Sequence, residues 1–350
     1  MQYFDLPTKL CFGAGALAAL QELKAQRTLL ITDQYFTQSG KADEILRLCG
    51  GEGRSFGDVQ PDPDLNLVAR GVKILQELQP DLLVALGGGS VIDCAKGILS
   101  MGRSSARFVA IPTTSGTGSE VTSFAILTHE GIKHPLVEEQ LRPQLAILDD
   151  SLLEQLPKSL IADGGMDLLS HCVEAVAAKN ASVFSTALAG CAFRSCLKLL
   201  PLSYAGDKSV RGAIHQAATM AGIAFDHGGL GICHALSHAL GGAFHLSHGR
   251  LNGILLPHVL EFNFPAASAA YGELASLCGL SSARALVFAL RRVRKLLELP
   301  ESLSQASLER GQVTKRLEEL AAAAIQDPCC ATNPRPVTAS DLVSLLRKAL

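Results

Sequence analysis

The stretch Asp81-Leu-Leu-Val-Ala-Leu-Gly-Gly-Gly-Ser-Val-Ile-Asp-Cys-Ala-Lys96 passes from a strand pattern to a helix pattern through a run of glycine. Residues 81–86 form the clearest strand pattern in the chain, and Gly87, Gly88 and Gly89 follow it directly. A glycine-rich turn at such a junction lets backbone N–H groups approach a phosphate, and the helix N-terminus adds a favourable dipole. An ordinary turn is the alternative, but three consecutive glycines favour a phosphate site. The pattern is not Gly-x-Gly-x-x-Gly, so the standard dinucleotide fingerprint is not implied.

The rest of the first half repeats this alternation of short apolar runs and helical patterns. Strands are expected at 6–12, 28–32, 108–111 and 145–148, a hairpin within 122–137, and helices at 41–48 and 65–78. Alternating strands and helices are typical of a parallel α/β domain. We therefore predict a Rossmann-like, nucleotide-binding α/β domain with a parallel sheet over residues 1–155.

A second polar loop follows the strand expected at 108–111. Its sequence is Pro112-Thr-Thr-Ser-Gly-Thr-Gly-Ser-Glu120, with five hydroxyl side chains and two glycines. A mobile Ser/Thr loop would have a similar composition. Its position after a strand of the same half favours a second loop that wraps a polar ligand.

The pattern changes after Asp149, where strand signals almost disappear. Helices are expected at 159–179, 183–200, 208–225, 268–277, 283–296, 314–325 and 340–350. Residues 156–350 are therefore predicted to form an all-helical domain that binds a metal and the substrate. A cofactor held by one half and a metal held by the other are expected to meet in a cleft between the two.

Four of the ten histidines stand close together in this helical half. His234, His238, His245 and His248 lie in a run without Lys, Arg, Asp or Glu from Gly228 to Gly249. A buried imidazole is costly unless it is hydrogen-bonded or bound to something, and neutral imidazole is a common metal ligand. One such histidine would be interpreted as a core residue, but four favour a metal site.

A carboxylate with the matching spacing lies upstream. Asp167 and His171 are four residues apart, as are His234 and His238, so each pair shares one face if the segment is helical. A carboxylate in an apolar helix needs a partner charge. One carboxylate and three imidazoles suit a divalent first-row metal such as Fe(II) or Zn(II).

Composition excludes several other classes. Hydrophobic residues make up 48% of the 350 residues. The formal net charge of −2 gives no excess of basic residues of the kind that binds nucleic acid. The ten cysteines are scattered, which is typical of reduced thiols in a cytoplasmic protein. The N-terminal sequence lacks the pattern of a signal peptide, and no membrane span or membrane partner is expected.

Together these motifs resemble the iron-containing (group III) alcohol dehydrogenases, nearly from end to end. The resemblance rests on Gly87-Gly-Gly-Ser-x-x-Asp-x-x-Lys96, Pro112-Thr-Thr-x-Gly-Thr-Gly-Ser-Glu120, Gly165-x-Asp-x-Leu-x-His171, and His234-x-x-x-His238 followed by His248-Gly. It implies the fold shared by dehydroquinate synthase and iron alcohol dehydrogenase. It also implies reversible oxidation of a small alcohol to its aldehyde with NAD(H).

The resemblance assigns roles to individual residues. It implies four metal ligands: Asp167, His171, His234 and His248. It places His238 near the nicotinamide as a catalytic proton relay, and Phe225 in the substrate pocket. It implies that the cofactor contacts Gly88, Gly89, Ser90, Asp93, Thr113, Thr114, Ser119 and Lys133.

Some residues depart from the family pattern, and these bear on the substrate. Leu168 and Ser170 replace the usual Ala and Thr, Ser237-His-Ala replaces Ala-His-Pro, and Arg250 and Leu251 follow His248 where smaller residues are common. All four implied ligands remain, so the metal site is expected. The departures change residues near these ligands, so the family pattern does not predict the shape of the substrate pocket.

The choice of cofactor depends on Asp33, at the end of the strand expected at 28–32. An acidic residue there typically faces the adenosine ribose and repels a 2′-phosphate, which favours NAD(H) over NADP(H). The alternative is an Asp that caps a turn.

Two other functions stay open. One is a glycerol or polyol dehydrogenase on the same fold, which usually lacks the histidine found here at His171. The other is a non-catalytic metal- or nucleotide-binding relative. The resemblance further implies a homodimer or larger homo-oligomer.

Overall fold

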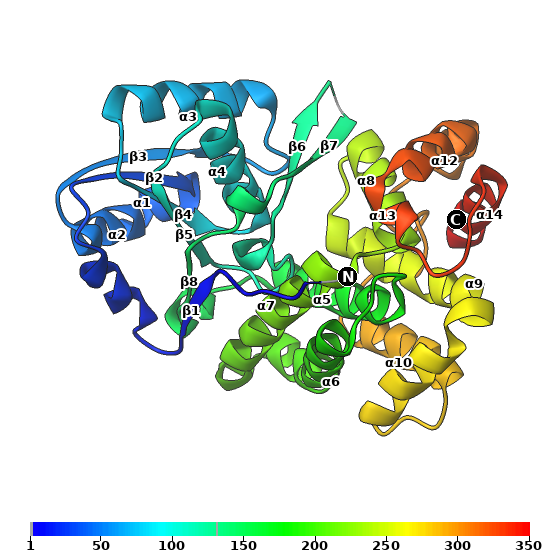
Figure 1. The fold of residues 1–350 in the computed structure, drawn as a ribbon. Helices are drawn as coiled ribbons and strands as arrows, with labels where there is room; N and C mark the ends of the chain where they lie inside the picture. Colours follow the sequence, from blue (N-terminus) through cyan, green and yellow to red (C-terminus); the bar gives the residue numbers. More distant parts are fainter. Residues whose placement is uncertain (1–2, 131) are drawn as a thin grey trace. The chain divides into compact units, whose positions relative to one another are not determined.

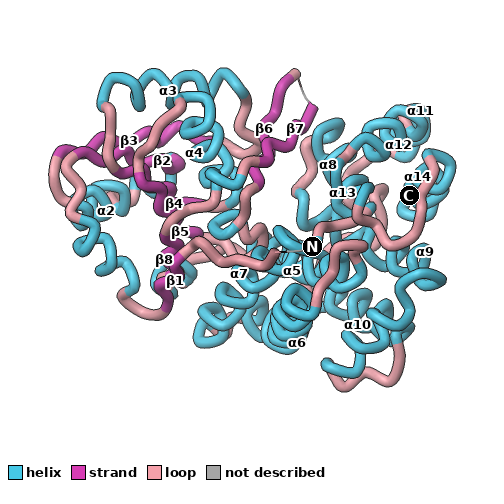
Figure 2. Tube along the Cα trace, in the orientation of Figure 1, coloured by secondary structure: helices cyan, strands magenta, loops and turns pink. Residues whose placement is uncertain are grey.

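The computed structural model describes residues 3–130 and 132–350. The chain divides into two compact units, Met1–Leu156 and Pro157–Leu350. All strands belong to the first unit, and residues 157–350, which are described throughout, contain only helices and connecting segments (Figures 1 and 2). This confirms the predicted combination of an α/β domain and a helical domain.

A parallel six-stranded sheet forms the first unit, in the order β1-β8-β5-β4-β2-β3. Its strands are β1 (Lys9–Phe12), β2 (Arg27–Asp33), β3 (Glu52–Val59), β4 (Leu82–Gly87), β5 (Arg107–Pro112) and β8 (Leu145–Leu148). All five strand pairings are parallel. A separate antiparallel hairpin joins β6 (Phe124–His129) to β7 (Ile132–Val137).

The strand order reverses between β2 and β4. From β2 the chain first moves outward to β3 and then returns to the other side of β2, where β4, β5 and β8 follow one another. In open parallel sheets, ligands bind beyond the carboxyl ends of the strands at such a reversal. Asp33 ends β2, and Gly87 ends β4 directly before the predicted contacts Gly88 and Gly89, so these predicted nucleotide contacts lie at this edge.

The two faces of the sheet bury different side chains because successive residues of a strand point to opposite sides. Leu83 and Ala85 of β4 join the core that packs against α3 (Leu65–Leu78) and α4 (Gly89–Gly102). Leu82 and Val84 join the core on the opposite face, against α2 (Lys41–Cys49) and the 3-10 helix η1 (Ala16–Leu23). A short helix, α1 (Gln34–Gln38), follows β2. Burial on both faces explains why β4 is apolar at every position.

Strand β3 is not among the strands expected from the sequence. Its residues are Glu-Gly-Arg-Ser-Phe-Gly-Asp-Val, of which only Phe56 and Val59 are buried. The strand lies at the edge of the sheet, and within residues 3–130 and 132–350 its partner strand is β2. An exposed edge strand needs neither an apolar run nor strict alternation, so the sequence carries no strong strand signal there.

The second unit is a bundle of helices. They are α5 (Lys158–Ala177), α6 (Val183–Ala205), α7 (Arg211–Gly228), α8 (Ile232–Phe244), α9 (His248–Leu277), α10 (Ala283–Leu296), α11 (Arg310–Lys315), α12 (Leu317–Gln326), α13 (Pro328–Ala331) and α14 (Ala339–Ala349). By length and composition alone, α6 is long and apolar enough to cross a membrane. It packs against α5 and α7 within this unit.

Helices α8 and α9 hold the histidine-rich stretch. The expected helix at 268–277 is only the last third of α9, which begins at His248 and continues through Pro257 and Pro265. The prolines and glycines of this stretch hide its helical periodicity in the sequence. The consequence for function is that His234 and His238 lie on α8, whereas His248 is the first residue of α9.

Candidate metal and cofactor sites

Three helices bring the predicted metal ligands together. Asp167 and His171 lie one turn apart on α5, which is buried along most of its length. His234 comes from the first turn of α8, and His248 begins α9. Asp167, His171 and His234 are each less than 5% exposed, so all three need polar or metal partners within the protein.

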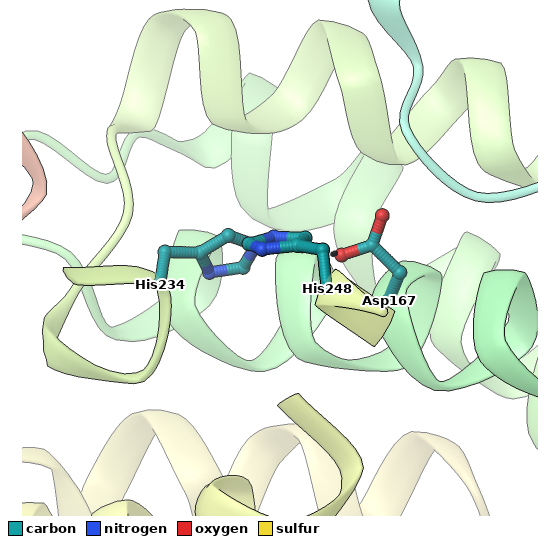
Figure 3. A group of neighbouring side chains, drawn as sticks. All are labelled: Asp167, His234 and His248. Atoms are coloured by element: carbon teal, nitrogen blue, oxygen red, sulfur yellow. Dashed lines mark ion pairs between the residues drawn. The ribbon is translucent and has the colours of Figure 1, made fainter. Parts of the chain in front are cut away.

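The carboxylate of Asp167 lies at the centre of the group. Its Oδ1 atom is 3.4 Å from Nε2 of His248 and 3.7 Å from Nε2 of both His171 and His234. The ligand atoms of Asp167, His234 and His248 all lie within 4.8 Å of one another (Figure 3). His171 is outside this trio, although its ring stacks on that of His234 with centroids 4.5 Å apart.

These spacings fit a divalent cation. Metal–nitrogen and metal–oxygen bonds of about 2.0–2.2 Å in a tetrahedral site separate neighbouring ligand atoms by about 3.3–3.6 Å. The Asp167–His248 separation of 3.4 Å falls within that range, and the separations of 3.7 Å from His171 and His234 lie just above it. The donor set, one carboxylate oxygen and three imidazole nitrogens, also suits Fe(II) or Zn(II).

The charges of the site residues also favour a divalent cation. Burial on its own would raise the pKa of Asp167, but the surrounding histidines lower it well below its usual range, so the carboxylate is ionised. For His234, burial lowers the pKa, and the carboxylates of Asp167 and Glu174 outweigh burial and raise it to about 9. Without a metal, the raised pKa favours the charged form of His234, with a proton on both ring nitrogens, at neutral pH.

This pKa makes a prediction about metal binding. A ligand must lose its proton before it coordinates a metal, so Zn(II) binding at pH 7 is expected to release about one proton, from His234. The apparent affinity should then rise about tenfold per pH unit from pH 6 towards 9. Calorimetric titration of metal-free protein in two buffers with different ionisation enthalpies measures the proton count. A binding enthalpy that is equal in both buffers would contradict the prediction.

Asn252 is a site residue that sequence reasoning missed. Its Nδ2 atom donates a hydrogen bond to Asp167 Oδ1 (2.8 Å) and lies 3.1 Å from Nε2 of His248. The hydroxyl of Ser237 donates to Asn252 Oδ1, which orients the amide. The positively polarised NH2 group of Asn252 thus points at Asp167 Oδ1 and His248 Nε2. These are the atoms that would attract a cation. Its position four residues after His248, on the same helical face, is the signal that could have identified it.

Close contact between α5 and α9 explains the glycine after His248. A Cβ atom on Gly249 would lie 1.9 Å from the backbone oxygen of Asp163. Beside it, Arg250 pairs with the buried Asp163 carboxylate at 3.2 Å. Arg250, a departure from the family pattern, therefore ties α9 to α5 in this chain.

His238 lies beside the ligand group and has its own carboxylate. Its ring stacks on that of His248 with centroids 5.0 Å apart. Its Nδ1 atom is 2.8 Å from Oδ2 of Asp327, a residue that sequence reasoning also missed. Burial raises the pKa of Asp327, but the hydrogen bond and charge of His238 outweigh burial and lower it to about 2. The ionised Asp327 fixes the orientation of the His238 ring.

The predicted pocket aromatic Phe225 packs directly against a predicted ligand. Its ring stacks on that of His171, with centroids 4.4 Å apart and an interplanar angle of 24°. Phe225 therefore restricts the orientation of His171. Its contact with a substrate stays a prediction.

In the first unit, the two glycine- and hydroxyl-rich loops touch. Gly88 caps α4 and Gly89 is its first residue. A Cβ atom on Gly88 would lie 3.2 Å from Thr114 Oγ1, and one on Gly89 would lie 2.7 Å from Thr117 Cγ2. Ser90 follows in the first turn of α4. The first N–H groups of α4 and the Thr114 loop therefore form one surface, as a phosphate cradle requires.

Two further predicted contacts, Asp93 and Ser119, bond to each other. Ser119 Oγ donates to Asp93 Oδ1 at 2.7 Å, and the N–H of Ile126 donates to Asp93 Oδ2 at 3.1 Å. The fully buried Lys96 donates to Ser119 Oγ (3.1 Å) and to the carbonyl oxygen of Thr122 (2.9 Å). These bonds hold the second loop against α4. Lys96 belongs to the glycine-rich motif, but the sequence predicts no role for it.

The remaining predicted cofactor contacts have partners within the protein. Asp33 Oδ1 accepts from the N–H of Phe36, so Asp33 caps α1. Lys133 pairs with Asp62 at 2.7 Å. The N–H of Thr113 donates to the carbonyl oxygen of Gly87, which continues the pairing of β5 with β4. Whether these residues also contact a cofactor stays a prediction.

Comparison with known proteins agrees with the site and the fold. Residues 7–150 match the family described as iron-containing alcohol dehydrogenase, and residues 161–350 match the C-terminal part of the Fe-containing alcohol dehydrogenase family. The chain is 37% identical to 1-propanol dehydrogenase PduQ of Citrobacter freundii, over 100% of both chains. It is 32% identical to an NADPH-dependent butanol dehydrogenase of Clostridium saccharobutylicum, over 98% of this chain and 96% of that protein.

A solved structure shows the same fold. An iron-containing alcohol dehydrogenase from Thermococcus thioreducens superposes with a TM-score of 0.94 and 32% sequence identity, over 99% of both chains. Both units of the present chain are therefore matched in sequence and in structure. With a carboxylate and three imidazoles gathered on α5, α8 and α9, the chain belongs to the iron-containing alcohol dehydrogenase family.

Proposed function

We propose that this protein interconverts a short-chain primary alcohol and its aldehyde, using NAD(H) and a divalent metal, with Fe(II) favoured and Zn(II) as the alternative. One observation carries the proposal: Asp167 Oδ1 lies within 3.4–3.7 Å of Nε2 of three buried or half-buried histidines. Relatives named for 1-propanol and butanol support a small aliphatic substrate.

The residues on α5, α8 and α9 hold the metal. Asp167, His171, His234 and His248 supply its ligands, and the low pKa of Asp167 keeps that ligand anionic. When bound, such a cation would act as a Lewis acid, which lowers the pKa of an alcohol and polarises an aldehyde carbonyl. NAD(H) supplies the hydride chemistry.

His238 is proposed to handle the proton. The Asp327 carboxylate, 2.8 Å from Nδ1, favours the tautomer with its proton on Nδ1. Nε2 is then the nitrogen that takes a proton from the alcohol and returns one to the aldehyde. Asp327 remains ionised through the cycle and stabilises the charged imidazole.

The first unit is proposed to bind NAD(H) at the reversal of the sheet. Gly88, Gly89 and Ser90 would bind the pyrophosphate through the N-terminus of α4. The second loop would contribute Thr113, Thr114 and Ser119. Asp93, which bonds to Ser119, and Lys133 would add further contacts to the cofactor. The position of these residues beyond the carboxyl ends of β4 and β5 supports this assignment.

Asp33 is proposed to favour NAD(H), although one relative is named as NADPH-dependent. Its carboxylate caps α1, and Asn caps a helix about as well as Asp. Asp33→Asn therefore removes the charge and keeps the cap. We expect it to raise the ratio of kcat/KM for NADPH to that for NADH by about tenfold, or 1.4 kcal/mol. An unchanged ratio would show that Asp33 does not face the ribose.

Steady-state assays with purified protein test the reaction itself. The proposal predicts that NADH reduces propanal and butanal, and that the reverse reaction oxidises 1-propanol better than glycerol. Faster oxidation of glycerol would move the assignment to a polyol dehydrogenase. A lack of turnover with either cofactor and any of these substrates would favour a non-catalytic relative. The homo-oligomeric state and the cytoplasmic location stay predictions.

A further inference from the structure

A second buried carboxylate lies directly behind the metal-ligand group. Glu174 is on α5, one turn after His171, and is 3% exposed. Its Oε2 atom is 2.6 Å from Nδ1 of His234, the ring nitrogen opposite the one that faces Asp167. No role follows for Glu174 from the predicted ligand set, although an anion buried so deeply needs a physical reason.

The start of α8 satisfies this carboxylate. The N–H of Gly231 donates to Oε2 at 2.9 Å, and the N–H of Cys233 donates to Oε1 at 2.7 Å. Both groups belong to the N-terminus of α8, where the helix dipole favours a negative charge. A Cβ atom on residue 231 would lie 2.6 Å from Oε1, so glycine there is what permits the approach.

Three donors thus converge on Glu174 from residues 231, 233 and 234. If the carboxylate served only to cap the helix, the two backbone donors would suffice. The third donor is a metal-ligand histidine, and the bond constrains which of its nitrogens carries the proton. When Nε2 loses its proton to a metal, the remaining proton stays on Nδ1, and Nε2 presents its lone pair on the side of Asp167 Oδ1, 3.7 Å away. Buried partners of this type orient metal-ligating histidines and increase their basicity.

We propose that Glu174 is a positioning residue that holds His234 in the metal-binding tautomer and so sets the metal affinity of the site. The proposal rests on the proposed function of the His234 group as a metal centre. Because Glu174 also caps α8, it fixes the N-terminus of that helix to α5 beside the metal-ligand group.

Glu174→Gln tests this link most sharply. The amide keeps the shape of the side chain and one acceptor oxygen, but it loses the negative charge, and in either orientation its NH2 group faces at least one of the three donors. We expect the dissociation constant for Zn(II), measured by chelator competition on metal-free protein, to rise about 10- to 100-fold. The visible absorption of the Co(II)-substituted protein should also change, because His234 is reoriented or lost as a ligand.

Glu174→Asp is the matched control, because it keeps the carboxylate and shortens its reach by one methylene. It should bind Zn(II) more tightly than Glu174→Gln. Thermal unfolding of both variants without metal measures the capping role separately. If both lose the same stability and Glu174→Gln keeps the wild-type Zn(II) affinity and Co(II) spectrum, Glu174 is a helix cap only and the inference is wrong. If wild-type protein itself fails to bind Zn(II), Co(II) or Fe(II), the proposed function fails instead.

Discussion

His248→Ala is expected to remove the bound metal and to lower kcat/KM for aldehyde reduction by at least about 1000-fold, or 4 kcal/mol. The reason is that His248 Nε2 lies nearest to Asp167 Oδ1 among the three histidines, at 3.4 Å. Its side chain is 25% exposed, so truncation leaves little buried cavity and the fold should persist. Metal content by elemental analysis and steady-state kinetics of the same preparation provide the two readouts.

His258→Ala is the matched control for this variant. His258 lies on the same helix, α9, ten residues later and outside the ligand group. It should retain metal and at least half of the wild-type kcat/KM. Wild-type metal content in His248→Ala would remove His248 from the site, and equal losses in both variants would point to damage of α9 instead.

Gly89→Val is expected to weaken NADH binding by about 100-fold, or 2.7 kcal/mol. Gly89 is the first residue of α4, where backbone N–H groups would bind the pyrophosphate. Its Cβ would lie 2.7 Å from Thr117 Cγ2, so a branched side chain must displace the second loop. Hydrogen bonds to a charged group contribute about 1.5–3 kcal/mol each, and losing one or two gives the expected size.

Fluorescence titration with NADH measures this effect, and Gly97→Ala on the same helix is its control. A Cβ on Gly97 would contact the flexible Leu127 side chain at 3.0 Å, away from the two loops. Gly97→Ala should bind NADH within about twofold of wild type. Metal content should be normal in both, since all four proposed ligands lie in residues 157–350. Unchanged NADH affinity in Gly89→Val would exclude the α4 N-terminus as the pyrophosphate site.

Local chemistry explains which parts of the fold were predictable. The helices at 65–78 and 283–296 have clear periodicity, and the structure has the same bounds for both. The strand at 82–87 is buried on both faces, so its apolar run is distinctive. By contrast, β3 is a polar edge strand, and α9 contains two prolines, so neither has the pattern that its secondary structure usually requires.

The candidate site divides in the same way. Asp167, His171 and the cluster of four histidines have residue types and spacings that indicate a metal from the sequence alone, and the family resemblance selects His234 and His248 as ligands. Their partner Glu174 carries no such signal, because its role arises from packing between helices that are distant in sequence, and Asn252 offers only its spacing of four residues from His248. Asp327 bonds to His238, from which it is separated by 89 positions in the sequence. Such contacts depend on how α5, α8, α9 and the segment before α13 pack, which spacing alone cannot predict.

The central claim is that a divalent metal on these four residues makes the protein an alcohol dehydrogenase. The most direct test is reduction of propanal, followed as loss of NADH absorbance, after chelation and anaerobic addition of Fe(II). We predict that chelation abolishes turnover and that Fe(II), or less effectively Zn(II), restores it in wild-type protein but not in His248→Ala. Full turnover after verified removal of the metal, or equal restoration in His248→Ala, would contradict this claim.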